Sequence, residues 1–157
     1  FFLCPLWLKG LLMSIRRRAR EIALQVLYQL DISQGDVREV LDLYWENFRP
    51  AAKAREFCQR LIEGVRQNQG QIDQLIEENS ENWTLKRMAA VDRNILRLAT
   101  FELLLCPDIP FKATLNEAIE LAKKFGTDDS SAFINGILDK IHSLLASAPN
   151  DRQAMAN

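Results

Sequence analysis

The 157-residue sequence is poor in the residues that build turns, with only 6 glycines and 5 prolines. A fold of many short strands needs turn residues at regular spacing, so this scarcity favours long helices. No two glycines lie closer than six positions apart. The sequence therefore has none of the G-x-G loops that hold phosphates and dinucleotides, including those of Rossmann-type methyltransferases.

Histidine and cysteine are scarce as well. His142 is the single histidine, and the three cysteines, Cys4, Cys58 and Cys106, are far apart in the sequence. This spacing gives no zinc-type ligand cluster and no neighbouring Cys–His pair, so we expect neither a metal nor a cofactor. Cys58 and Cys106 are predicted to be small core residues. An odd number of scattered cysteines also suits a reducing cytoplasm, which predicts a cytoplasmic protein.

Paired carboxylates do not indicate an enzyme either. Glu77-Glu78 ends one predicted helix and Asp128-Asp129 precedes another. Such positions are typical of solvated charge and helix caps rather than of an acid/base pair. The net charge of −1 arises from 20 basic and 21 acidic residues, so only the distribution of charge can indicate a polyanionic partner.

The first residues do not resemble a targeting signal. Phe1–Leu12 reads FFLCPLWLKGLL, and arginines follow this apolar run, whereas a secretory signal has its basic residues first. The run is also too short and too interrupted to span a bilayer. We interpret residues 1–13 as a non-native or disordered leader before a start at Met13; an amphipathic membrane anchor is the alternative.

Apolar residues repeat with helical spacing over most of the remaining chain. The first stripe is Ala19, Ile22, Ala23, Val26, Leu27 and Leu30. Further helices are predicted over Val37–Asn47, over about 54–65 and after Gly70. Asn79–Thr84 is a polar linker, which predicts the end of an N-terminal subdomain spanning residues 14–80.

Leu85–Leu105 is apolar almost all round, which predicts a central, buried helix. Thr114 and Glu117 have the spacing of a capping box at the start of the next helix. Gly126 stands where a helix end favours a positive φ. Asp128 or Asp129 is expected to cap the last helix, and Gly136 is expected to allow close approach of a neighbouring helix.

No segment alternates with the period of a strand. The predicted fold is therefore all-α, with about seven helices in two small packed helical subdomains, residues 14–80 and 81–146. A flexible tail is expected over residues 147–157.

Four arginines and no acid fall within Ser14–Arg20. Positive charge at a helix start opposes the helix dipole, so a polyanionic partner would explain it. Arginine offers forked donors to phosphate and a planar face for stacking on bases. Residues 86–97 are also basic after an acidic stretch over 73–81, which fits either two binding faces or ordinary pairing on helix surfaces. A solvated basic end that only improves solubility is the alternative for the arginines.

Several motifs, taken in order, resemble the NusB-type transcription antitermination factors. They are Arg16–Tyr28, Val91–Leu103, Ile109-Pro110 with Asn116–Lys123, and Phe125-Gly126 with Asp129–Lys140. The match covers about residues 14–141, whereas the region 33–50 is individual to this chain. The resemblance implies an all-helical fold of two subdomains and a role without enzymatic activity.

The resemblance also implies partners and site residues. The partners are a boxA-type single-stranded RNA, the small-subunit ribosomal protein NusE, and the RNA polymerase antitermination complex, chiefly at ribosomal RNA operons. By position, the expected RNA-binding residues are Arg16, Arg17, Arg18, Arg20, Tyr28, Asp129 and Phe133. Asp92 falls in the region that meets NusE. From periodicity, Phe133 is either a core residue or an exposed stacking residue.

Two other functions fit parts of the pattern. Helical domains similar to NusB occur fused to ribosomal RNA cytosine methyltransferases, although this chain has no Rossmann half. The second alternative is a helical adaptor that binds only proteins, in which the arginines of Ser14–Arg20 serve solubility alone.

Overall fold

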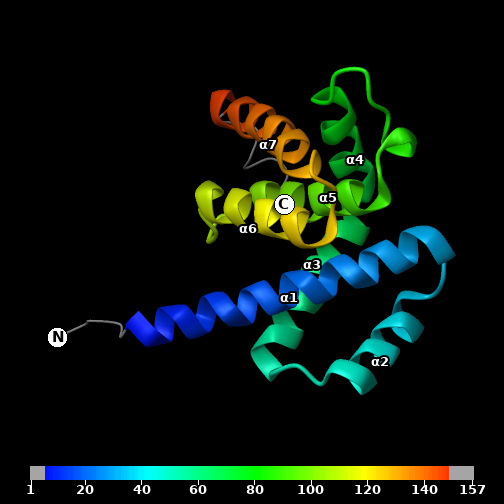
Figure 1. Cartoon of the computed structure of the whole chain (residues 1–157), viewed down its shortest axis with the longest axis vertical. Helices are drawn as coiled ribbons and strands as arrows, with labels where there is room; N and C mark the ends of the chain where they lie inside the picture. Colours follow the sequence, from blue (N-terminus) through cyan, green and yellow to red (C-terminus); the bar gives the residue numbers. More distant parts are fainter. Residues whose placement is uncertain (1–5, 149–157) are drawn as a thin grey trace. The chain divides into compact units, whose positions relative to one another are not determined.

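The computed structural model describes residues 6–148, with side chains from Ser14 onward. Over this range the chain forms seven α-helices, one short 3-10 helix and no strand, which confirms the predicted all-α class (Figure 1). It divides into two compact units, residues 1–64 and 65–157. The division lies within α3 (Ala52–Gln67) and differs from the boundary placed at Asn79–Thr84, because α4 (Gln69–Glu78) packs on α5 (Ala90–Leu105).

The first unit is built from α1 (Leu6–Ser33), α2 (Val37–Phe48) and most of α3. Helix α1 begins at Leu6, within the segment 1–13 interpreted as a leader. Residues 1–5 and the tail 149–157 lie outside the described part of the chain. The predicted apolar stripe of α1 is buried throughout, and α1 packs against α2.

A tight connection joins α1 to α2. Gln34 takes a left-handed backbone conformation with φ 53°, and the Asp36 side chain accepts the Arg38 backbone N–H at 2.8 Å. This is an N-cap bond that satisfies one of the free donors at the start of α2. At the other end Arg49 is also left-handed, and Pro50 follows it. The two helices therefore form an antiparallel hairpin (Figure 1).

Cys58 lies within the core of the first unit, as predicted, and Cys106 is buried in the second. Burial raises the pKa of the Cys58 thiol to about 12, because the apolar surroundings disfavour the thiolate. The Cys58 thiol is therefore protonated at neutral pH and serves as a small apolar core group.

The second unit surrounds α5 with α4, α6 (Phe111–Phe125) and α7 (Ser130–Ser147). Every residue from Asn94 to Glu102 is buried, so the prediction of a central buried helix is confirmed. Neighbours on three sides leave α5 little solvated face (Figure 1).

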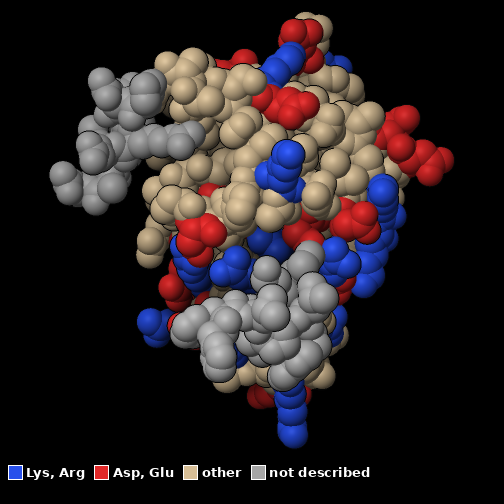
Figure 2. All heavy atoms as spheres, turned by 90° about the vertical axis from the view of Figure 1, so that its left-hand side faces the viewer, with Lys and Arg blue, Asp and Glu red and all other residues tan. Residues whose placement is uncertain are grey.

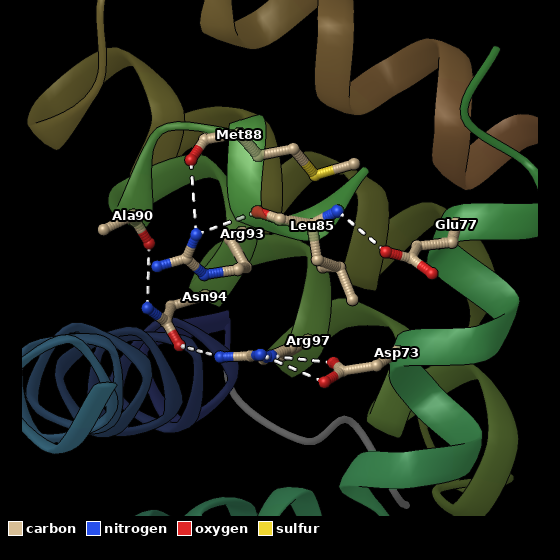
Figure 3. Close-up of polar contacts among 8 residues, drawn as sticks. All are labelled: Asp73, Glu77, Leu85, Met88, Ala90, Arg93, Asn94 and Arg97. Atoms are coloured by element: carbon tan, nitrogen blue, oxygen red, sulfur yellow. Dashed lines mark hydrogen bonds and ion pairs between the residues drawn. The ribbon is translucent and has the colours of Figure 1, made fainter. Parts of the chain in front are cut away.

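The central helix is shorter than the predicted Leu85–Leu105. A 3-10 turn, η1, covers Leu85–Arg87, and Met88 is extended before α5 begins at Ala90. The Arg93 guanidinium donates to the carbonyl oxygens of Leu85 (2.8 Å) and Met88 (3.3 Å), as Figure 3 shows. The Leu85 carbonyl also accepts the Met88 N–H at 3.2 Å, so the Arg93 guanidinium adds a donor to each of these carbonyls where the chain turns at Met88.

The capping box predicted at Thr114 is wrong. Helix α6 begins three residues earlier, after Pro110, and the buried Thr114 hydroxyl donates to Glu102 Oε1 at 3.3 Å.

Gly126 follows the end of α6 and has a φ of −93°, so the positive φ predicted there is wrong too. A Cβ there would lie 2.5 Å from Ser130 Oγ and 2.7 Å from the Ala122 oxygen, so lack of space favours glycine at this position.

Two details of α7 also differ from expectation. The Asp129 side chain makes no cap bond; Ser130 Oγ instead accepts the Thr127 N–H at 2.9 Å. A Cβ built on Gly136 would meet nothing within 4 Å, so this glycine does not mediate a close helix contact. The prediction that the helix continues through Asn135-Gly136 is confirmed.

Candidate nucleic-acid interface

Arg16 and Arg20 pack on a single aromatic ring in the first unit. They lie one turn apart on α1, and each guanidinium carbon is 5.3 Å from the centroid of Phe57 on α3. This distance is within the range of a cation–π contact. Arg20 is only 4% exposed, so its side chain packs within the interior, whereas Arg16 is half-buried.

Arg17 and Arg18, by contrast, are exposed. Arg18 forms an ion pair with Glu21 at 3.4 Å, and its guanidinium carbon lies 5.5 Å from the ring centroid of Phe48. An exposed pair of this kind contributes little to stability, so Arg18 can exchange it for a phosphate at small cost. The supporting rings Phe48 and Phe57 were not predicted, because nothing in their local sequence indicates these contacts.

Tyr28 lies on the same exposed side of α1 as Arg17. Eleven residues separate them, which corresponds to about three turns and about 16 Å along the axis. Tyr28 is 40% exposed, and Gln25 between them is half-buried. We call Arg17, Arg18, Gln25 and Tyr28 the α1 stripe. It carries cationic, amide and aromatic groups along one side of the helix.

Asp129 and Phe133 lie in the second unit, at the start of α7. Asp129 is exposed, and Phe133, one turn later, is half-buried. The core stripe of α7 consists of Ile134, Ile137, Leu138 and Ile141, all buried. Phe133 is therefore outside this core. Its ring meets Trp83 at a centroid distance of 6.0 Å and an interplanar angle of 71°.

The acidic and basic residues of α4 and α5 pair within the second unit. Arg97 donates to both carboxylate oxygens of Asp73, at 2.8 and 3.0 Å, and Glu77 accepts the Leu85 N–H at 2.9 Å (Figure 3). Lys140 pairs with Glu81 at 3.0 Å. These pairs favour ordinary internal pairing over two separate binding faces of opposite sign.

The surface view agrees with this interpretation. On the face shown in Figure 2, basic and acidic atoms are interspersed, and no large area of one sign is visible. On this face, binding of a polyanion would therefore depend on a few placed side chains, not on a broad positive field.

Asp92 occupies the first turn of α5 and is 9% exposed. Its Oδ1 atom is buried and has no hydrogen-bond partner within the described residues. A carboxylate in the first turn of a helix is favoured by the helix dipole, but a buried acceptor without a donor costs free energy. Among the described residues, Asp92 Oδ1 is therefore an unsatisfied buried acceptor in the first turn of α5.

The described residues hold neither a metal-binding cluster nor a membrane-spanning helix. Residues 6–148 contain no group of three or more His, Cys, Asp or Glu side chains arranged to hold a metal ion. In the same part of the chain, no helix has the length and apolarity needed to cross a membrane.

These features define a small all-helical protein with exposed cationic and aromatic side chains on two helical units. A model of the NusB family matches residues 17–143, and the chain belongs to this family. Curated members are named transcription antitermination proteins, and the family consists of transcription factors that are not enzymes.

The similarity extends over most of each chain. The transcription antitermination protein NusB of Geotalea uraniireducens is 56% identical over 141 residues, covering 85% of this chain and 97% of the relative. The structure of T. maritima NusB is 43% identical with a TM-score of 0.76, covering 82% and 90%. A crystal structure of NusB and NusE in complex with dsRNA is 26% identical with a TM-score of 0.78, covering 84% and 98%.

Proposed function

We propose that this chain binds a boxA-type single-stranded RNA together with NusE in the cytoplasm, and that the pair acts within an antitermination complex on RNA polymerase, chiefly at ribosomal RNA operons. The observation that carries the proposal is the α1 stripe, which presents Arg17, Arg18 and Tyr28 on one exposed side of a helix. The related structure of NusB and NusE in complex with dsRNA supports NusE and RNA as partners of this chain.

The side chains suit different parts of an RNA strand. Exposed arginines on a helix contact phosphates, which position a strand without reading its sequence. Tyr28 and Phe133 offer ring faces on which unpaired bases stack, and the Asp129 carboxylate can accept a hydrogen bond from a base amino group. Arg16 and Arg20, which pack on Phe57, have a positioning role: they hold the start of the α1 stripe in place.

The other two functions have less support. The curated relatives are antitermination proteins matched over nearly their whole length, which favours this role over the helical domain of a methyltransferase. A protein-only adaptor does not need aromatic and cationic groups exposed on the same side of α1. Titration with RNA separates this adaptor from an RNA-binding protein.

Arg17 and Phe133 are expected to affect RNA binding in different ways. Arg17→Gln should weaken binding of cognate and scrambled RNA alike, and it should reduce the slope of log K against log salt by about 0.7 for a single strand. Phe133→Ala should lower affinity for boxA RNA about 5- to 150-fold with an unchanged salt slope, because stacking involves no counterion release. Fluorescence anisotropy with labelled RNA across a salt series, with and without NusE, measures both effects.

A matched control is Lys123→Gln, which removes one exposed charge paired with Glu120 on α6. It should leave both affinity and slope nearly unchanged. If wild-type protein binds no RNA even with NusE, or if Lys123→Gln matches Arg17→Gln, the RNA-binding proposal is wrong. A sharp fall in melting temperature for Phe133→Ala, with normal binding by the folded fraction, would assign that ring to the core.

Asp92 is proposed to accept a hydrogen bond from NusE. Asp92→Asn should weaken the protein pair roughly 10-fold or more, as expected for a lost charge-assisted hydrogen bond. RNA binding by this chain alone should not change. Isothermal titration with NusE and anisotropy with RNA give the two affinities, and Glu120→Gln, an exposed carboxylate removed elsewhere, is the control. Equal losses in both assays would contradict a separate NusE contact.

A further inference from the structure

Trp83 is a large aromatic residue with an exposed ring on the linker between α4 and η1. Its side chain is 47% exposed. The buried Ser80 hydroxyl lies 3.0 Å from the Trp83 carbonyl oxygen and 3.3 Å from that of Glu77, and it can donate to either. This contact ties the Trp83 backbone to the end of α4.

Two neighbours make this position suitable for a flat ligand. Phe133 meets Trp83 nearly perpendicularly, so neither ring covers the other as in a parallel stack. The Arg87 guanidinium carbon lies 6.0 Å from the Trp83 ring centroid, at the outer limit of a cation–π contact. Arg87 is exposed, and the acidic Glu81 nearby in sequence is paired with Lys140. The cluster thus combines an exposed indole, a neighbouring phenyl ring and a cation.

We propose that Trp83 is a second nucleobase-stacking residue of the RNA site, next to Phe133, and that Arg87 contacts the adjoining phosphate. This inference rests on the proposed RNA-binding function. Its basis is the combination of an exposed indole, the perpendicular Phe133 ring and the exposed arginine, which is the arrangement that sequence-tolerant single-strand binding uses.

A protein partner is less suited to this cluster. Protein-binding aromatic residues usually lie in larger, well-packed apolar patches. The residues next to Trp83 in the linker, Glu81, Asn82 and Thr84, are all exposed and polar or charged. Among the described residues of the second unit, Leu144 is the other exposed large apolar residue, and it lies near the end of α7, in a different element.

The test is anisotropy with boxA-type RNA on Trp83→Ala, Trp83→Phe and Arg87→Gln. Trp83→Ala should lower affinity about 5- to 150-fold with the salt slope unchanged, and Trp83→Phe should retain most of the affinity because a ring remains. Arg87→Gln should reduce the salt slope by about 0.7. Leu144→Ala is the control for loss of exposed apolar surface and should bind normally. Melting temperatures establish that each variant is folded.

The double variant Trp83→Ala/Phe133→Ala distinguishes direct stacking of a base on Trp83 from an indirect role in which Trp83 only supports Phe133. If Trp83 only supports Phe133, adding Trp83→Ala to Phe133→Ala should have no further effect; direct stacking predicts a further loss. RNA should also quench tryptophan fluorescence in the wild type more than in Trp83→Phe, because only the former has an indole at this position.

The outcomes distinguish this inference from the proposed function. If wild-type protein binds boxA RNA and Phe133→Ala weakens it, but Trp83→Ala does not, the inference is wrong and the RNA-binding function stands. If Trp83→Ala weakens NusE binding but not RNA binding, the cluster is a protein contact and the inference is wrong. If wild type binds no RNA with or without NusE, both are overturned.

Discussion

Replacement of Ile95 by aspartate is expected to leave the protein largely unfolded at 25 °C. Ile95 has no exposed surface on α5, the helix that contacts α4, α6 and α7. The substitution removes about 1.5–3 kcal/mol of apolar burial and places a carboxylate in a site without solvent contact. The two effects together cost several kcal/mol of unfolding free energy, which is comparable with the total stability of a domain, about 5–15 kcal/mol.

Circular dichroism and urea titration measure this effect. Ile95→Val, which removes one methylene without adding charge, should remain folded and lose only about 0.5–1.5 kcal/mol. Leu144→Asp is a matched control, because Leu144 is exposed and the aspartate there stays in water. A cooperative urea transition for Ile95→Asp near the wild-type midpoint would contradict the central role of α5.

Removal of the Arg97 side chain is expected to cost about 3 kcal/mol of unfolding free energy. Arg97 donates to both carboxylate oxygens of Asp73 and to Asn94 Oδ1, at 3.3 Å. The two paired side chains are 9% and 22% exposed, so water replaces the lost bonds poorly. Arg97→Ala leaves the Asp73 carboxylate partly buried without its charged partner, and this penalty accounts for most of the loss.

A double-mutant cycle isolates the pair. Arg97→Ala and Asp73→Ala should each destabilise strongly, and the double variant should lose clearly less than the sum, because the second removal takes away an already unpaired group. The exposed pair Lys140–Glu81 is the comparison: Glu81→Gln should change stability by less than about 1 kcal/mol. Additive losses for Arg97 and Asp73 would show that the ion pair is not the source of the stability.

The helices follow from the sequence alone. The spacing of apolar residues predicts α2, α4 and α7 to within a few residues and identifies α5 as the central helix. This is possible because burial on one side of a helix repeats every 3.6 residues, and that pattern is contained in short stretches of sequence. The resemblance to the NusB family likewise needs only the order and spacing of the motifs along the chain.

The assignment of individual polar groups needed the tertiary structure. Thr114 has the local pattern of a helix cap, but its hydroxyl bonds to Glu102, twelve residues earlier. Arg20 resembles its exposed neighbours in sequence, yet it packs under the ring of Phe57. Trp83 stands in a polar linker and becomes part of an aromatic cluster only because α7 brings Phe133 beside it.

The physical reason is the range of the interactions. Helix formation depends on backbone bonds between residues four apart and on local side-chain spacing, so the sequence determines where the helices lie. Hydrogen bonds, ion pairs and ring contacts form between side chains that packing brings together, such as Asp73 and Arg97, 24 residues apart. The sequence by itself therefore determined the helices and the family, whereas the tertiary structure decided which arginines pack inside and which side chains remain exposed.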